Sequence, residues 1–124
     1  MTAFPPVVLD ALRAARTVEI ETSAGAGRPI HRAVIWIVVH EERVLVRSVR
    51  GDRGRWYREL LANPSGAVHV AGTRIPVVAQ PAGDAARVAS CSAALTAKYR
   101  TSLGSLASMV RDEVLETTLE LRPA

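Results

Sequence analysis

Residues 44–64 read VLVRSVRGDRGRWYRELLANP, and this stretch decides the fold that we expect for the chain. Residues 44–48 are mostly β-branched or apolar and alternate their side chains between two faces, which is typical of a strand. Residues 50–55 form a basic loop that contains two glycines. Residues 56–62 favour a helix, which Pro64 ends because proline cannot continue it. The stretch therefore predicts a strand, a basic loop and a short helix in succession.

The sequence on either side of this stretch predicts more strands. Residues 17–22 alternate apolar and acidic side chains, as a half-buried strand does. Residues 31–39 are apolar on both faces, which favours a strand buried on two sides. Polar turns at 40–42 and about Gly72-Thr73 indicate two hairpins.

Six strands and four helical segments are expected in all. The expected strands are residues 17–22, 31–39, 44–48, 67–71, 74–79 and 114–121. The expected helices are residues 7–15, 56–62, 85–99 with Asp84 as N-cap, and a short segment after Gly104. Short strands joined mainly by hairpins predict an antiparallel barrel or curled sheet with peripheral helices.

The length and composition indicate a single folded domain. At 124 residues the chain suits one domain, 1–124, in which residues 1–16 supply an N-terminal helix packed on the barrel. The longest apolar run, residues 33–39, is far shorter than the about 20 residues of a membrane span. The N-terminus lacks the pattern of a signal peptide, so we expect a cytoplasmic protein without a membrane anchor. The single cysteine, Cys91, excludes an intramolecular disulfide.

The strand, loop and helix of residues 44–64 resemble the pyridoxamine 5′-phosphate oxidase-like split barrels. Within that superfamily the chain is similar to the deazaflavin-dependent nitroreductases. The matching elements are Gly27-Arg28-Pro29, Trp36, Ser48, Gly51, Trp56 and Ala62-Asn63-Pro64. The resemblance implies a mainly β fold, an antiparallel six-stranded split β-barrel with peripheral helices.

The chain is closer still to a small family of unknown function, the DUF2255-like proteins of the same superfamily. The shared elements are Arg-Ser-x-x-Gly at 47–51, Trp56-Tyr57, Lys98-Tyr99 and Thr117-Thr118-Leu119. The likeness spans about residues 16–122. The superfamily includes FMN enzymes, deazaflavin enzymes, haem-binding proteins and members that bind no cofactor, so the resemblance leaves open which cofactor is bound, if any.

A phosphate-bearing cofactor needs hydrogen-bond donors that converge on one point. Arg47, the Ser48 hydroxyl, the backbone N–H groups near Gly51 and the start of the helix at Trp56 are candidates. Arg50, Arg53 and Arg55 could add charge. The alternative for these arginines is a solvated rim, because 16 of the residues are basic and Lys98 is the only lysine among them.

Three further residues are candidates for cofactor contacts. Trp36 and Trp56 could stack on a flavin ring, or could pack in the core or at a dimer interface. His31 lies at a strand entrance, where the resemblance places cofactor contacts; a surface histidine is the alternative. No metal-ligand spacing and no Ser-His-Asp arrangement is present in the sequence, so we expect no metal site and no side-chain nucleophile.

Three functions stay open from the sequence. The resemblance implies a flavin- or deazaflavin-dependent oxidoreductase of a small-molecule substrate, with FMN or the deazaflavin coenzyme at a homodimer interface. The second is a non-catalytic protein that holds a flavin, haem or another small anion on the same fold. The third is a nucleic-acid-binding module, suggested by an isoelectric point of about 10.2 and the loop arginines. It is disfavoured by an aromatic content of 4%, which is low for base stacking.

Overall fold

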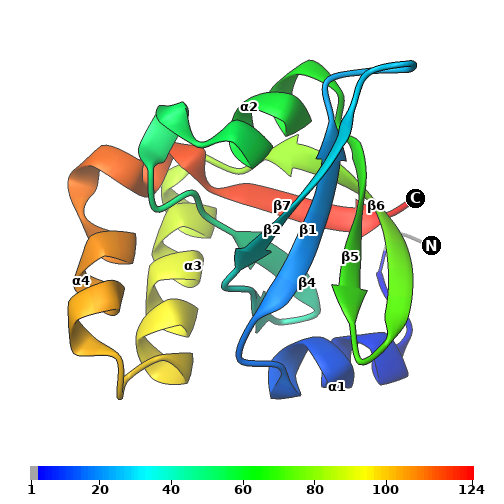
Figure 1. Ribbon diagram of the computed structural model, residues 1–124. Helices are drawn as coiled ribbons and strands as arrows, with labels where there is room; N and C mark the ends of the chain where they lie inside the picture. Colours follow the sequence, from blue (N-terminus) through cyan, green and yellow to red (C-terminus); the bar gives the residue numbers. More distant parts are fainter. Residues whose placement is uncertain (1–2) are drawn as a thin grey trace.

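The structure is a computed structural model that describes residues 3–124, and it contains a single curled antiparallel sheet (Figure 1). The strand order is β2-β1-β5-β6-β7-β4-β3. The strands are β1 (Val18–Ser23), β2 (Ile30–Ile35), β3 (Val38–His40), β4 (Arg43–Val46), β5 (Ser65–Val70), β6 (Thr73–Pro81) and β7 (Leu119–Pro123). The helices are α1 (Pro6–Ala14), α2 (Arg55–Ala62), α3 (Ala85–Lys98) and α4 (Leu103–Val110), with 3₁₀ turns η1 (Gly51–Arg53) and η2 (Asp112–Thr117).

Two tight hairpins shape the sheet. Glu41 and Glu42 join β3 to β4, and both have positive φ angles, 49° and 71°. Ala71 and Gly72 join β5 to β6 with φ angles of 50° and 75°. Two central residues with positive φ make the turn type whose twist matches that of antiparallel strands. Both predicted hairpins are therefore confirmed.

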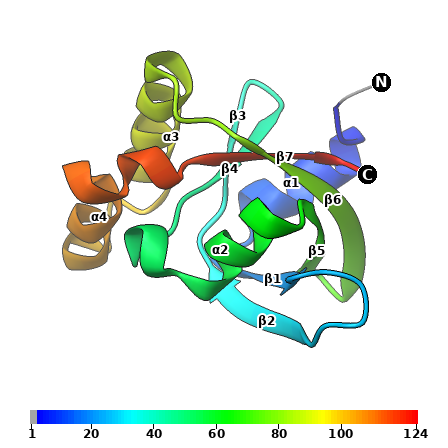
Figure 2. The ribbon, with the colours of Figure 1, turned by 90° about the horizontal axis from the view of Figure 1, so that it is seen from above.

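Two helices close the ends of the curled sheet, as Figures 1 and 2 show, with α1 at one end and α2 at the other. Leu9 and Leu12 of α1 and Tyr57 and Leu60 of α2 are buried in the same core as the inward side chains of the strands. Because apolar burial stabilises by roughly 25 cal/mol per Å², these faces fix the helices on the sheet.

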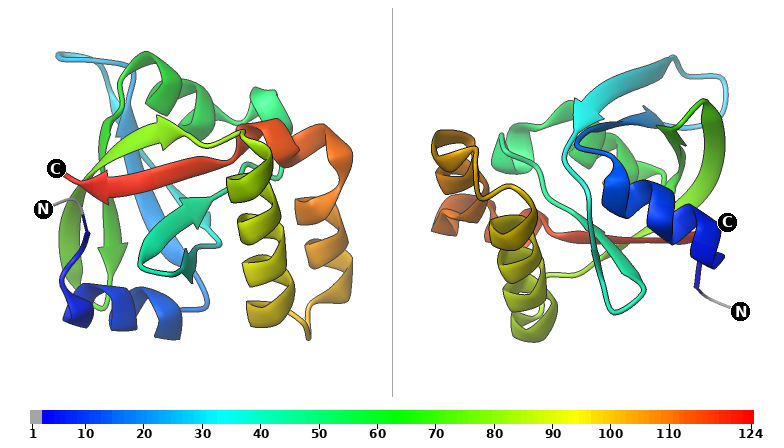
Figure 3. Two further views of the ribbon diagram at one scale, coloured as in Figure 1. Left: turned by 180° about the vertical axis from the view of Figure 1, so that it is seen from behind. Right: turned by 90° about the horizontal axis from the view of Figure 1, so that it is seen from below.

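A second, smaller core lies beside the barrel. α3 and α4 run side by side, and Figure 3 shows them in the same place from behind and from below. Cys91 and Leu95 of α3 and Met109 of α4 pack there with Val38 of β3 and Leu45 of β4. This pair of helices thus covers the outer face of the β3–β4 hairpin.

The predicted class, mainly antiparallel β with peripheral helices, is confirmed, but the sheet has seven strands rather than six. The expected strand 31–39 is divided at Trp36-Ile37 into β2 and β3, which lie at opposite edges of the sheet. It is also not buried on both sides: Val34 is 66% exposed, because β2 is an edge strand whose outer face no element covers among residues 3–124.

The last predicted strand also needs correction. Residues 114–121 were expected to be extended, yet residues 112–117 form η2 and β7 begins at Leu119. The Thr117 hydroxyl donates to the Val114 carbonyl over 2.7 Å, and this local bond favours the turn over an extended chain.

The predicted helices occur close to their expected bounds. Asp84 caps α3, because its carboxylate accepts the Arg87 N–H over 3.1 Å. The N-terminal helix begins at Pro6, and residues 1–2 of its predicted segment lie outside the described part of the chain. None of the helices within residues 3–124 has the length and apolar character needed to cross a bilayer.

Candidate functional site

Two threonines directly before β7, Thr117 and Thr118, anchor the chain beyond β4. The Ser48 N–H donates to Thr117 Oγ1 over 3.0 Å, and Arg47 Nε donates to Thr118 Oγ1 over 2.9 Å. Successive residues of an extended chain direct their side chains to opposite sides. Arg47 and Ser48 are therefore held firmly, but in different surroundings.

Ser48 lies at the bottom of a groove of about 510 Å³ between β2 and the start of α2. Its hydroxyl oxygen is buried and has no hydrogen-bond partner within residues 3–124. A Cβ at position 54 would overlap this oxygen, so Gly54 leaves space for it. A buried hydroxyl without a partner is costly in the free protein, which makes the groove beside Ser48 a candidate ligand site.

The groove is rich in donors that suit an anion. Arg50 and Arg55 line it, and the first turn of α2 begins beside Ser48 at Gly54. Gly54 supplies no side-chain cap, and the first N–H groups of any helix lack intrahelical acceptors. This donor set has the positive charge and the free N–H groups that a phosphate group needs.

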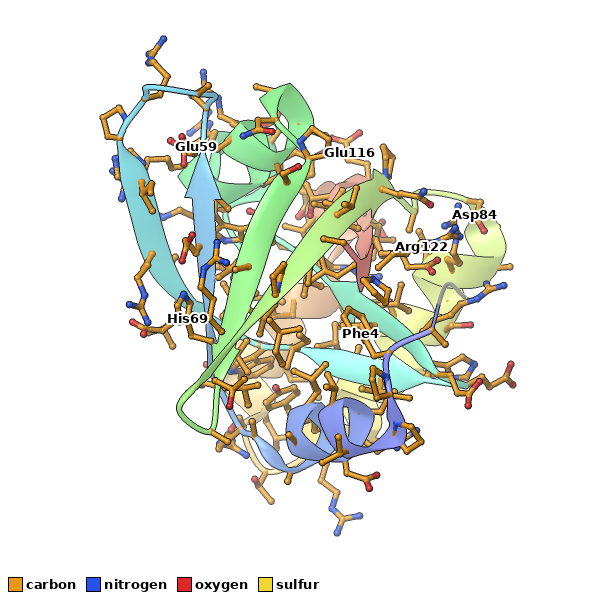
Figure 4. All side chains as sticks on the ribbon, turned by 90° about the vertical axis from the view of Figure 1, so that its right-hand side faces the viewer. Phe4, Glu59, His69, Asp84, Glu116 and Arg122 are labelled. Carbon is orange, nitrogen blue, oxygen red and sulfur yellow. The ribbon has the colours of Figure 1, made fainter. Side chains whose placement is uncertain are left out.

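His31 lines the same groove and is fixed from α2. Its Nδ1 lies 2.9 Å from Glu59 Oε2, and Thr22 Oγ1 donates to Glu59 Oε1 over 2.7 Å. Figure 4 shows Glu59 on α2 beside the β1–β2 hairpin. The carboxylate thereby orients the imidazole, whose Nδ1 is engaged with it.

Arg47 is separated from this groove and lines an adjoining pocket of about 270 Å³. Its side chain is only 2% exposed, and burial lowers the pKa of its guanidinium. The structure therefore does not bring Arg47 to the anion groove beside the Ser48 hydroxyl. The two cavities meet, because Val34, Val49 and Trp56 line both.

Both tryptophans lie at the smaller pocket. Trp36 lines it and stacks on Tyr99, with ring centroids 3.8 Å apart and planes 3° from parallel. Trp56, at the start of α2, lines the pocket and the groove together. Of the two tryptophans, only Trp56 is thus placed to contact ligands in both cavities.

Gly51 and Arg53 lie outside both cavities. Gly51 has a φ of 65° and donates its N–H to the Ser48 carbonyl over 3.0 Å, so it forms the turn that leads to α2. Arg53 lines a different surface depression with Arg58 and Glu59. Of the three loop arginines considered for the site, Arg50 and Arg55 line the groove and Arg53 does not.

Cys91 and the histidines offer no second reactive centre in the described residues. Burial raises the pKa of the Cys91 thiol to about 11, so it stays protonated and unreactive at neutral pH. No group of three or more His, Cys, Asp or Glu residues that could hold a metal ion occurs within residues 3–124. The site therefore offers binding and orientation rather than a side-chain nucleophile.

Sequence reasoning missed Gly54 and the roles of Thr117 and Thr118. The second glycine of the 50–55 loop, directly before a helix, is a signal for close backbone approach and could have indicated Gly54. The threonines are far from Ser48 in sequence, and only the pairing of β7 with β4 brings them together.

The chain is similar to several solved structures with the same fold. HutZ from Vibrio cholerae, described as a heme storage protein, has a TM-score of 0.68 at 15% identity, over 98% of this chain and 91% of that chain. The F420-H2-dependent reductase FDR-A has a TM-score of 0.63 at 14% identity, over 86% and 93%. A pyridoxamine 5′-phosphate oxidase-like protein from Listeria innocua has a TM-score of 0.63 at 11% identity, over 95% and 90%.

These identities show the fold alone, which is that of the pyridoxamine 5′-phosphate oxidase-like split barrels. A search of curated proteins gives no significant match. A family model matches residues 8–121, nearly the whole chain. The chain therefore belongs to the DUF2255 family, described as uncharacterized proteins conserved in bacteria.

Proposed function

We propose that this protein is a flavin- or deazaflavin-dependent oxidoreductase that binds the phosphate of its cofactor in the groove at Ser48. The observation that carries the proposal is the buried Ser48 hydroxyl without a partner, beside Gly54 and the first turn of α2. A phosphate oxygen there would accept the hydroxyl proton and relieve the cost of its burial.

The likeness to flavin-type and deazaflavin-type proteins gives the proposal its cofactor class. FDR-A is described as F420-H2-dependent, and the Listeria protein resembles a pyridoxamine 5′-phosphate oxidase. A bound flavin would supply the hydride chemistry itself. The chain's own residues would hold the phosphate through Ser48 and Arg50 and offer the Trp56 ring to a planar group.

The adjoining pocket favours an enzyme over a carrier. A protein that only stores its ligand needs no second cavity beside it. Here a pocket of about 270 Å³ shares Val34, Val49 and Trp56 with the groove. A second molecule could therefore lie next to the cofactor, as turnover of a small-molecule substrate requires.

A homodimer would complete the site. Val34 and Val49 line the groove and are 66% and 47% exposed, and Ile30 on the same edge strand is 67% exposed. A second copy packed on β2 would cover these side chains and shield the groove from water. The dimer and the cofactor site are thus one proposal.

The test is a titration of cofactor-free protein with FMN, with riboflavin, which lacks the phosphate, and with the deazaflavin coenzyme and haem. We expect one phosphate-bearing flavin to bind, and FMN to bind more tightly than riboflavin if FMN is the cofactor. Ser48→Ala should weaken binding of that cofactor by about 1.5–3 kcal/mol, the contribution of a charge-assisted hydrogen bond.

Two glycine variants serve as a matched pair. Gly54→Ala displaces the Ser48 hydroxyl, so it should weaken cofactor binding as Ser48→Ala does. Gly104→Ala has open space around its Cβ and should leave binding unchanged. Equal affinity of wild type and Ser48→Ala for every flavin would refute the proposed phosphate site, and binding of haem alone would favour the storage function.

A further inference from the structure

Arg47 is a buried cation without a carboxylate partner. Its guanidinium donates to Thr118 Oγ1 at 2.9 Å, Ser92 Oγ at 2.8 Å, the Met109 carbonyl at 3.1 Å and the Val88 carbonyl at 3.0 Å. All four acceptors are neutral. No Asp or Glu within residues 3–124 forms an ion pair with it, whereas six other arginines have such a partner.

The Arg47 guanidinium therefore keeps an uncompensated positive charge and one free N–H donor within residues 3–124. A guanidinium has five N–H groups, and the four bonds above use one on Nε, two on Nη1 and one on Nη2. One Nη2 N–H therefore has no acceptor among residues 3–124. A buried positive charge that only neutral dipoles solvate is costly, and an anion beside it would offset that cost.

The pocket next to Arg47 has the lining of a site for a small aromatic or apolar molecule. Trp36, Trp56 and Met109 supply broad apolar surfaces. Thr17 and Ser105 add two hydroxyl groups at the same pocket. One face of the Trp36 indole is covered by Tyr99, and this stacking fixes the ring in place.

We propose that this pocket binds a small aromatic carboxylate, with the carboxylate directed to Arg47 and the ring against the two tryptophans. A volume of about 270 Å³ suits a single ring with a short acid group. A monoanion matches the single positive charge, whereas a phosphate dianion would need more donors than one N–H and two hydroxyls.

The proposal that this pocket binds a ligand depends only on Arg47 and the other lining residues. Its identification as the substrate site rests on the proposed function, because the pocket meets the groove that would hold the cofactor at Val34, Val49 and Trp56. An aromatic carboxylate in this pocket would lie directly beside a flavin in the groove.

Tryptophan fluorescence gives a direct test, because the chain has two tryptophans and both line this pocket. Cofactor-free protein is titrated with benzoate and with benzamide, which has the same shape and no charge. We expect benzoate to bind at least about tenfold more tightly, as a charge-assisted bond requires. Equal affinity for the two probes would overturn the proposal.

Variants on α4 make the test independent of the Arg47 side chain, whose replacement could prevent folding. Ser105 is exposed and lines the pocket, so Ser105→Phe should fill it and abolish benzoate binding. Ala107 is exposed on the same helix and lines no part of the pocket, so Ala107→Phe should bind benzoate as wild type does. Unchanged binding in Ser105→Phe would overturn the proposed location.

A parallel FMN titration separates this inference from the proposed function. Benzoate binding without any flavin binding would support the carboxylate site and count against the flavin cofactor. Flavin binding without a preference for benzoate over benzamide would overturn the carboxylate site and leave the proposed cofactor untouched.

Discussion

Ser48 has a buried hydroxyl without a hydrogen-bond partner among residues 3–124. Its backbone N–H, by contrast, donates to Thr117 Oγ1 over 3.0 Å. The contrast with Arg47 is informative, since that side chain makes four hydrogen bonds to the protein. Packing alone would favour alanine at position 48, which agrees with the proposed role of this serine in binding a cofactor phosphate.

Ser48→Ala should therefore stabilise the cofactor-free protein. Removing a buried hydroxyl without a partner should raise the free energy of unfolding by about 1 kcal/mol, measured by urea unfolding. Ser92→Ala is the control, because the Ser92 hydroxyl accepts from Arg47 and its loss should be destabilising. Destabilisation by Ser48→Ala would mean that its hydroxyl has a structural partner.

Glu21 of β1 is held by two basic side chains from neighbouring strands. Hydrogen bonds from Arg74 at 2.9 Å and with His69 at 2.7 Å hold its pKa at about 2, below its ordinary value of 4.5. His69 projects from β5 in Figure 4. The network thus connects β1, β5 and β6 across three adjacent strands.

Glu21→Gln should lower the stability in a pH-dependent way. A pKa that is lower in the folded state gives stabilisation that is complete above about pH 4.5 and is lost as the pH falls towards about 2. The difference in unfolding free energy between wild type and variant should shrink across that range in urea titrations. Glu19→Gln, which removes an exposed pair with Arg32, should show little difference at any pH.

The connection between β2 and β3 is fixed by the end of α3. The Ile37 N–H donates to Tyr99 Oη over 3.2 Å, and Lys98 Nζ donates to the Ile37 carbonyl over 2.7 Å. The Tyr99 hydroxyl in turn donates to the Arg16 carbonyl over 2.8 Å. Lys98-Tyr99 therefore satisfies the backbone groups that the break between the two strands leaves unpaired.

Tyr99→Phe should destabilise the protein although the ring still stacks on Trp36. The loss leaves the buried Ile37 N–H without an acceptor, so the free energy of unfolding should fall by about 1–3 kcal/mol in chemical denaturation. Tyr57→Phe is the matched control, because the Tyr57 hydroxyl makes no hydrogen bond to any of the described residues. Equal effects of the two substitutions would contradict this role of Tyr99.

The whole sheet ends in two free edges, β2 and β3, and their outer surfaces differ. α3 covers β3, whereas β2 exposes Ile30 and Val34. Six arginines pair with acidic side chains, which offsets part of the positive charge of the chain. The exposed apolar side chains of β2 support the proposed association through this edge.

Val34→Glu should therefore convert a dimer to a monomer and weaken flavin binding. A charge at a buried interface position is costly to desolvate, so light scattering after size exclusion should show half the wild-type mass. Val7→Glu is the control, since Val7 is 74% exposed on α1, away from β2, and should leave the mass unchanged. A monomeric wild-type protein would refute the proposed interface.

The local sequence determined the elements of this protein, and it did so through short-range chemistry. The alternation at residues 17–22, the two hairpin turns, Asp84 as a helix cap and Pro64 after a helix all act within a few residues. Those signals predicted an antiparallel β-rich fold, and the resemblance named its superfamily and family. They also selected Ser48, Arg50, His31 and Trp56, which the fold brings to one groove.

The tertiary structure alone decided how those elements meet. Residues 31–39 are apolar throughout, and that pattern cannot show the break at Trp36-Ile37, which depends on Tyr99 some sixty residues later in the chain. Arg47 looked like a partner of Ser48 because the two are adjacent, yet their side chains enter different cavities. Whether a buried polar group has a partner depends on residues distant in sequence, and only the folded chain brings those residues together.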